Sequence, residues 1–138
     1  MPDLNGSCLC GNVRYRCSAE PSMTAICHCP NCQKQTGTAF SIIVAVPEES
    51  LSITDAGSLS EYLDTGATGG AVRRRFCGNC GSPIVSIVES VPGAAFIKAG
   101  TLDDRSWLEP TLHIWCDTAQ PWVEIAEDMT TTPRNPPT

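Results

Sequence analysis

The sequence lacks long hydrophobic runs and a surplus of basic residues, and aromatic residues make up only 6% of it. No apolar stretch approaches the roughly 20 residues that span a bilayer, so we expect no membrane-spanning segment. The 15 acidic residues outnumber the 9 basic ones, which gives a formal charge of −6. Nucleic-acid binding usually requires a cationic surface, and the only basic run is Arg73-Arg74-Arg75. We therefore expect neither a membrane protein nor a nucleic-acid-binding protein.

The N-terminus also lacks the features of a secreted protein. Residues 1–6 show neither the basic region nor the apolar core of a signal peptide, so we expect a cytoplasmic protein. Disulfides are rare in that reducing compartment, and the nine cysteines therefore favour metal binding or catalysis. The length suits one domain, which we place over residues 1–127. A polar, Pro-rich tail over residues 128–138 is expected to be flexible.

Short segments rich in β-branched residues, separated by turn residues, predict a mostly β fold. The strongest is residues 40–46, an apolar run closed by Pro47. One short helix is expected over residues 31–36 and should end at Gly37. Strands are expected over residues 13–17, 23–29, 40–46, 51–53, 59–63, 72–76, 84–88, 95–99 and 111–115.

Two cysteine pairs predict a structural zinc site. Cys77 and Cys80, followed by Gly81, have the spacing of a zinc knuckle, in which a tight turn aims two thiolates at one point. Glycine after the second cysteine tolerates the positive φ that such a turn requires. Cys8 and Cys10 are the available second pair and would complete a four-cysteine site. The alternative is that Cys8 and Cys10 are simply small buried residues.

Three further cysteines lie within six residues, and they predict a second metal site of a different kind. In an extended segment Cys27 and Cys29 project from the same face, and Pro30 ends the strand so that Cys32 returns toward them. Three ligands leave the fourth position of a tetrahedral zinc open, as in catalytic zinc sites. We therefore predict that Cys27, Cys29 and Cys32 form the catalytic centre.

The alternative for these three cysteines is a closed structural site with His28, Cys17 or Cys116 as the fourth ligand. His28 would project away from its two neighbours in an extended segment and is a poor ligand candidate. Cys17 is expected in the core, and His113 is expected to be an ordinary hydrogen-bonded residue. Cys116 follows a strand and precedes Asp117, where a reactive thiol is conceivable, although no neighbour in sequence lowers its pKa.

Arg73 and Arg75 are expected on one face of a strand and Arg74 on the other. The usual role of such a run is solvated charge. An arginine near the zinc would be able to bind the carboxylate of a substrate.

Taken together, these motifs resemble the glutathione-dependent formaldehyde-activating enzyme family, which also includes centromere protein V. The resemblance covers residues 6 to about 125 and rests on the segments Gly6–Tyr15, Cys27–Gly37, Arg75–Gly81, Ala99–Asp104, His113–Trp115 and Pro121-Trp122. It implies a β-tent fold of antiparallel sheets with short helical turns. It also implies two Zn²⁺ per chain, a structural ion at Cys8, Cys10, Cys77 and Cys80 and a second ion at Cys27, Cys29 and Cys32. One departure is Gln120, where members of the family often carry a lysine shortly before the Pro-Trp pair.

The resemblance further implies a carbon–sulfur lyase that joins formaldehyde to glutathione, giving S-hydroxymethylglutathione, or cleaves such adducts. The expected partners are a small thiol like glutathione and an aldehyde. A thiol that binds zinc is deprotonated, which suits attack on an aldehyde. A zinc ion with three thiolates is electron-rich and a weak Lewis acid, which favours presentation of a thiolate over polarisation of a carbonyl.

Two other classes of function are consistent with the sequence. Some β-tent zinc proteins are binding modules, and such a protein would need only the structural zinc. Methionine-R-sulfoxide reductases resemble this architecture and use a cysteine late in the chain, where Cys116 lies.

Overall fold

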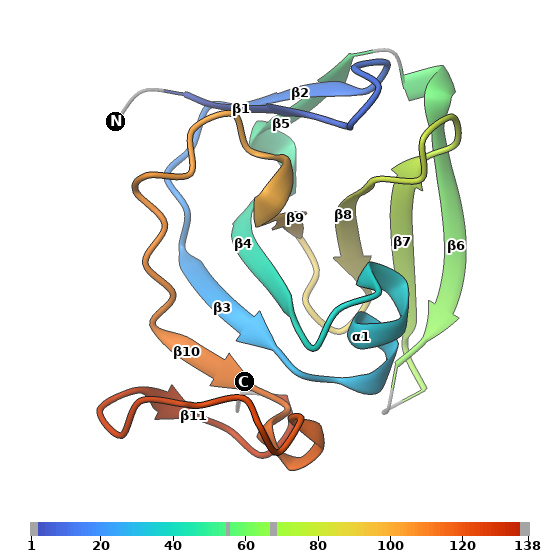
Figure 1. Ribbon diagram of the computed structural model, residues 1–138. Coiled ribbons are helices and arrows are strands. Elements are labelled where there is room, and N and C mark those ends of the chain that lie inside the picture. Colours follow the sequence, from blue (N-terminus) through green and yellow to red (C-terminus); the bar gives the residue numbers. More distant parts are fainter. Residues whose placement is uncertain (1–2, 55, 67–68, 136–138) are drawn as a thin grey trace.

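The strands form two sheets, which the computed structural model describes over residues 3–54, 56–66 and 69–135 (Figure 1). A three-stranded sheet has the order β1-β2-β5, and an eight-stranded sheet has the order β11-β10-β3-β4-β9-β8-β7-β6. The strands are β1 (Leu4–Ser7), β2 (Arg14–Cys17), β3 (Met23–Cys27), β4 (Ser41–Pro47), β5 (Leu51–Thr54), β6 (Leu59–Thr65), β7 (Ala71–Cys77), β8 (Pro83–Val88), β9 (Ala94–Lys98), β10 (Leu112–Ile114) and β11 (Thr130–Thr131). The predicted mostly β fold is confirmed.

The helical segments are short. The only α-helix among the described residues is α1 (Pro30–Thr36). Figure 1 shows it beside the large sheet, at the end that is farther from the small sheet. The remaining helical turns are η1 (Glu48–Ser50), η2 (Ala56–Ser58), η3 (Ala99–Thr101) and η4 (Cys116–Thr118). The two-sheet arrangement with short helical turns agrees with the predicted β-tent.

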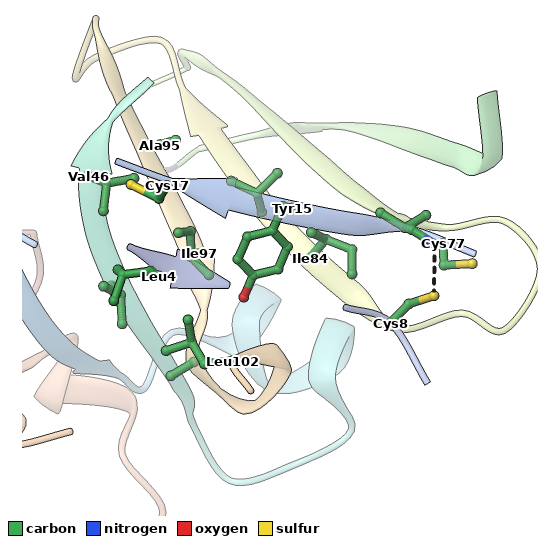
Figure 2. Packing of buried hydrophobic residues seen from close by; sticks show 14 residues of the cluster. Leu4, Cys8, Tyr15, Cys17, Val46, Cys77, Ile84, Ala95, Ile97 and Leu102 are labelled. Carbon is green, nitrogen blue, oxygen red and sulfur yellow. Dashed lines mark hydrogen bonds between the residues drawn. The ribbon is translucent and has the colours of Figure 1, made fainter. Parts of the chain in front are cut away.

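The main core lies between the two sheets (Figure 2). Tyr15 and Leu4 of the small sheet contribute to it, together with Val44 and Ile97 from the centre of the large sheet. Alternating side chains of a strand face opposite sides of its sheet, so the even-numbered valines of β4 enter this core. The sulfurs of Cys8 and Cys77 lie side by side at one end of the cluster in Figure 2, which places a pair of predicted ligands directly beside the core.

A second core lies on the other face of the large sheet. Its members include Ala25, Cys27 and Ile43 from β3 and β4, and Cys32 from α1. Because β3 and β4 are buried on both faces, their sequences read as nearly continuous apolar runs. This second core positions the three-cysteine segment against the sheet.

Local chemistry explains where α1 begins and ends. Pro30 occupies the first turn, where its missing N–H costs nothing, and the sulfur of Cys29 accepts from the backbone N–H of Cys32 at the N-terminus. Gly37 ends the helix with φ 68°, a left-handed conformation that favours glycine. The predicted end at Gly37 is confirmed, and the helix begins one residue earlier than expected.

The C-terminal part differs from the prediction of purely antiparallel sheets. β10 pairs in parallel with β3 and with β11, so the large sheet is mixed. Residues 130–135 are held by hydrogen bonds rather than extending away, because the backbone N–H groups of Trp115 and Cys116 donate to Arg134 and Thr132. The indole of Trp115 also donates to Asn135, at 2.8 Å. Residues 136–138 of the predicted tail lie outside the described residues.

Among the described residues, no helix has the length and hydrophobicity needed to cross a membrane.

Candidate metal centres

The two predicted cysteine groups are each brought together by the fold. Within each group the sulfur atoms lie within 4.8 Å of one another, so that each group could hold a metal ion. All nine cysteines of the chain are free thiols rather than disulfides. The four-cysteine group consists of Cys8, Cys10, Cys77 and Cys80, and the three-cysteine group consists of Cys27, Cys29 and Cys32.

The four-cysteine group joins the two sheets. Cys8 and Cys10 follow β1 of the small sheet, whereas Cys77 ends β7 of the large sheet and Cys80 lies in the turn before β8. The sulfur of Cys10 lies 3.6 Å from that of Cys8 and 3.8 Å from that of Cys77. A metal ion held here would therefore tie the N-terminal strands to the β7–β8 hairpin.

The turns around this group direct neutral hydrogen-bond donors at the sulfurs. The backbone N–H groups of Asn79 and Cys80 donate to the sulfur of Cys77, and that of Val13 donates to Cys8. The side-chain amide of Asn79 donates to Cys10 at 3.2 Å. Gly81 has φ 83°, the left-handed conformation predicted for the residue after the second cysteine of the knuckle.

These donors change the acidity of the thiols. The Ser82 hydroxyl and backbone are the largest influences on Cys80 and lower its pKa to about 5. Burial works against ionisation of Cys8, but the Val13 amide and the neighbouring sulfurs outweigh it and lower the pKa of Cys8. Since the thiolate is the form that binds metal, hydrogen bonds that favour it suit a metal site.

The three-cysteine group forms where β3 passes into α1. Cys27 ends β3, Cys29 is extended with ψ 148° and caps the helix, and Cys32 lies in the first helical turn. This is the local geometry predicted from the spacing around Pro30. Cys27 and Cys32 are buried, whereas Cys29 is partly exposed.

None of the proposed fourth ligands joins this group within residues 3–54, 56–66 and 69–135. Cys17 lies in the main core, where its sulfur contacts the Ser50 hydroxyl at 3.2 Å. The thiol of Cys116 donates to the backbone carbonyl of His113, and burial raises the pKa of Cys116. The group therefore offers three ligands and leaves a tetrahedral ion with one position to fill.

His28 turns away from its two neighbouring cysteines, as predicted, and is fully buried. Its Nε2 lies 2.9 Å from Nδ1 of His113, and the two rings are nearly parallel, with their planes 13° apart. A ring-centre separation of 5.1 Å at that nitrogen distance corresponds to two roughly coplanar rings sharing one proton, rather than to face-to-face stacking. The predicted ordinary role of His113 as a hydrogen-bonded residue is consistent with this pair.

The C-terminal loop fixes the backbone of the three-cysteine segment. The Thr118 hydroxyl donates to the carbonyl of His28 at 3.0 Å, and the Gln33 amide donates to the same carbonyl at 2.7 Å. Gln120 donates to the side-chain oxygen of Gln33 at 2.8 Å. Gln120, the residue that departs from the family pattern, thus contacts α1 through Gln33.

The arginine run divides as the strand pattern predicts. Arg73 and Arg75 both pair with Glu61 on one side of β7. Arg74 faces the other side, is only 7% exposed, and lies 3.8 Å from the sulfur of Cys32. Its remaining partners are Asp64 at 2.9 Å and the Gln35 side-chain oxygen at 3.0 Å. Arg74 is therefore the arginine near the three-cysteine group, but it is already engaged with protein groups.

Lys98 is a functional candidate that the sequence reasoning missed. It is only 6% exposed, and its ammonium donates to the Ser41 hydroxyl at 2.9 Å. Ser41 lies directly opposite Cys27 in the β3–β4 pairing. The available signal was a lysine inside the apolar strand predicted over residues 95–99, where a charged side chain is rarely buried without a partner.

Hydrogen bonds and charge together determine the acidity of the three thiols. Contacts with the sulfurs of Cys27 and Cys29 lower the pKa of Cys32, and the positive charges of Lys98 and Arg74 lower it further. The pKa of Cys27 is raised in turn, because its contacts with Cys29 and Cys32 favour its protonated form. The geometry agrees with the lowered pKa of Cys32, because the guanidinium of Arg74 lies 3.8 Å from its sulfur.

The fold and the two cysteine groups define a mostly β protein with two candidate metal centres. The sequence matches the model of the glutathione-dependent formaldehyde-activating enzyme family over residues 3–118. The chain therefore belongs to that family, as its motifs predicted.

Individual relatives agree with this assignment. The chain is 31% identical over 115 residues to an Aspergillus flavus protein named as a glutathione-dependent formaldehyde-activating enzyme, covering 80% of the chain and 59% of the relative. It is 29% identical over 101 residues to an uncharacterized lyase of Schizosaccharomyces pombe, covering 72% of the chain and 68% of the relative. The chain thus spans about three fifths of the length of the Aspergillus flavus protein.

A crystal structure of a Rhodobacter sphaeroides protein has the same fold. It superposes with a TM-score of 0.59 at 21% identity and covers 77% of this chain and 91% of its own.

Proposed function

We propose that this protein is a zinc-dependent enzyme of the carbon–sulfur lyase type that forms or cleaves adducts between a small thiol and an aldehyde. Family membership supports a formaldehyde-activating or lyase function. The observation that supports the proposal most directly is the three-cysteine group, which offers three ligands beside two buried cations. The named activity of the relatives suggests glutathione and formaldehyde as the substrates.

The proposal assigns two zinc ions per chain. The four-cysteine group fits a closed structural ion, because four soft sulfur ligands with amide donors around them satisfy tetrahedral coordination. The three-cysteine group fits an ion with one exchangeable position. Nine free cysteines also support a cytoplasmic location, where thiols remain reduced.

In the proposed reaction the sulfur of the bound thiol attacks the aldehyde carbon. A carbon–sulfur bond forms, the electron pair of the carbonyl π bond moves to oxygen, and that oxygen takes a proton from solvent. The cleavage direction reverses each of these changes. When bound, zinc supplies the positive charge that keeps the thiol deprotonated.

The residues of this chain would contribute orientation and charge. Cys27, Cys29 and Cys32 would hold the ion, and Cys29 is the partly exposed ligand among them. Lys98 and Arg74 offset the negative charge of the thiolates, which would otherwise be costly in a buried site.

Zinc-edge X-ray absorption, recorded with and without glutathione, tests the open position. We expect the average number of sulfur ligands per zinc to rise when glutathione is added, because a fourth sulfur enters only the three-cysteine site. If all zinc already has four sulfur ligands and ignores added thiol, the catalytic proposal is wrong and the second site is structural.

Replacement of Cys116 separates this proposal from a redox enzyme. The raised pKa of Cys116 and its hydrogen bond to the His113 carbonyl give it no support as a reactive thiolate. A Cys116→Ser variant should therefore keep most of the lyase turnover. Loss of all turnover in that variant would favour the redox alternative.

A further inference from the structure

A row of polar side chains crosses the face of the large sheet that α1 covers. Residues paired directly across antiparallel strands point to the same face, as do residues two apart in one strand. Ser41 lies opposite Cys27, and Lys98 lies opposite the residue two positions after Ser41. On one side Ser86 lies opposite Phe96, which is two residues before Lys98 in β9. On its other side Ser86 lies opposite Arg74 of β7. Arg74 lies opposite Tyr62 of β6, and Asp64 is two residues after Tyr62 in the same strand. We call Cys27, Ser41, Lys98, Ser86, Arg74 and Asp64 the polar row.

Each of the adjacent strands β3, β4, β9, β8, β7 and β6 contributes one residue to the polar row. Helix α1 lies over it, since the Asn31 amide donates to Asp64 and the side chains of Cys32 and Gln35 both accept from Arg74. The three-cysteine group occupies one end of the row, at Cys27. The space between helix and sheet is thus bordered by metal ligands and by buried polar groups together.

Several donors in this space have no protein partner. The Ser86 hydroxyl and the Gln35 side-chain nitrogen are buried without a hydrogen-bond partner among the described residues. Ser86 is only 5% exposed. The Lys98 ammonium carries three N–H donors, but Ser41 is its one hydrogen-bond partner among the described residues. Buried polar groups in folded proteins are nearly always satisfied, so these donors indicate a ligand or an ordered water.

The charges in this space point to the chemistry of that ligand. Arg74 and Lys98 are both buried. Burial lowers the pKa of Lys98 and the charge of Arg74 lowers it further, whereas the three thiols favour the charged ammonium. Asp64, the acidic member of the row, is already paired with Arg74. The groups that remain unsatisfied are hydroxyl, amide and ammonium donors. The ligand that satisfies them is an acceptor, and the two cations favour one with negative charge.

We propose that Lys98, Ser86 and Gln35 form a subsite beneath α1 that binds a negatively charged oxygen of the molecule whose sulfur binds at the three-cysteine group. This inference rests on the proposed function and deepens it. Two sources supply such an oxygen. One is the carboxylate of a short mercapto acid, and the other is the aldehyde-derived oxygen of the adduct, which lies two bonds from the sulfur.

Acetate, which has the carboxylate but no thiol, tests the subsite independently of any reaction. In a ¹H–¹⁵N spectrum of the metal-loaded protein, acetate should shift the side-chain amide signals of Gln35. Lys98→Met should weaken acetate binding roughly tenfold, and Ser86→Ala should weaken it about threefold, as expected for loss of a charged and a neutral hydrogen bond. The smaller Ser86→Ala change keeps the test valid if Lys98→Met fails to fold.

Two control variants are matched to these. Lys34→Met removes the same charge from the exposed side of α1, and Ser52→Ala removes the same hydroxyl from the exposed side of β5. Both should bind acetate like the parent protein. The subsite is refuted if acetate leaves the Gln35 signals unchanged, or if Lys34→Met weakens binding as much as Lys98→Met.

Calorimetry with two thiols identifies the source of the oxygen. If it is a carboxylate, mercaptoacetate binds about tenfold more tightly than 2-mercaptoethanol, and Lys98→Met abolishes that preference. If it is the aldehyde oxygen, the two thiols bind equally, and Lys98→Met lowers kcat for addition of 2-mercaptoethanol to formaldehyde at unchanged KM for the thiol. Either pattern would support the subsite. A failure of both thiols to bind, with acetate binding intact, would refute the proposed function instead.

Discussion

The two cysteine groups differ in what surrounds their sulfurs. The four-cysteine group receives backbone N–H donors and the neutral side chains of Asn79 and Ser82. The three-cysteine group has the buried cations Arg74 and Lys98 beside it. Neutral amide donors suit a coordination sphere whose charge never changes, whereas buried cations suit a centre whose ligand charge varies. The comparison indicates that the surroundings, as well as the number of ligands, separate a structural from a reactive site.

Loss of a ligand from the four-cysteine group should have the largest effect. Cys80→Ser removes one of four ligands that join β1 to the β7–β8 hairpin, and structural zinc binding contributes directly to folding. We expect the variant to unfold or precipitate, as measured by circular dichroism and by metal analysis of the soluble fraction. A folded, soluble variant with one zinc ion would remove the support for a structural role.

Loss of a ligand from the three-cysteine group should have the next largest effect, and a different one. Cys29→Ser should retain the fold and one zinc equivalent but lose the second zinc, and its activity should fall to the uncatalysed background. Cys116→Ser is the matched control and should keep both metals. Metal content and thermal unfolding of the two variants, measured together, check this. If Cys29→Ser unfolds like Cys80→Ser, the distinction between the two groups disappears.

Removal of the buried cation Arg74 should have an intermediate effect on stability. Arg74→Met leaves Asp64 without its cationic partner in a partly buried position, which should cost about 3 kcal/mol in the free energy of unfolding. Arg73→Met is the control, because its pair with Glu61 is largely solvent-accessible and should contribute at most about 1 kcal/mol. Urea unfolding of both variants gives the comparison. Equal losses would show that burial of Arg74 adds nothing.

The small sheet beside the four-cysteine group allows the mildest test. The Tyr15 hydroxyl donates to the Thr101 hydroxyl at 2.7 Å, because the single Thr101 proton goes to the Lys98 carbonyl. Tyr15→Phe should cost about 1 kcal/mol in urea unfolding. Thr101 keeps its bond to the Lys98 carbonyl in that variant, so no buried hydroxyl is left unsatisfied. An unchanged free energy of unfolding would contradict this contribution.

The same residue makes a pH prediction. Burial raises the pKa of Tyr15 from 10.0 to about 12, so the folded state favours the neutral phenol. The resulting stability is fully present below pH 10 and is lost as the pH rises toward 12. In a Tyr62→Phe variant Tyr15 is the only tyrosine, and phenolate absorbance follows it alone. A midpoint near pH 10 with the fold intact would show that Tyr15 is not shielded.

The sequence alone determined the local chemistry of this protein. The spacing around Pro30 and around Gly81 specified both turns that aim cysteines at a common point, since backbone geometry within a few residues decides such turns. Alternation in β7 placed Arg74 on the opposite face from its neighbours. The seven-cysteine pattern also identified the family, which the match over residues 3–118 confirms.

Only the tertiary structure decided what lies beside the cysteines. Lys98 and Cys27 are 71 positions apart and meet through the pairings of β4 with β3 and β9, which no local pattern specifies. The strand at Thr130–Thr131 forms because β10 offers a free edge, which no local pattern in that segment specifies. Ser86 and Gln35 carry no signal in the sequence. They become candidate ligand-binding groups because the sheet and α1 bury the Ser86 hydroxyl and the Gln35 side-chain nitrogen without partners.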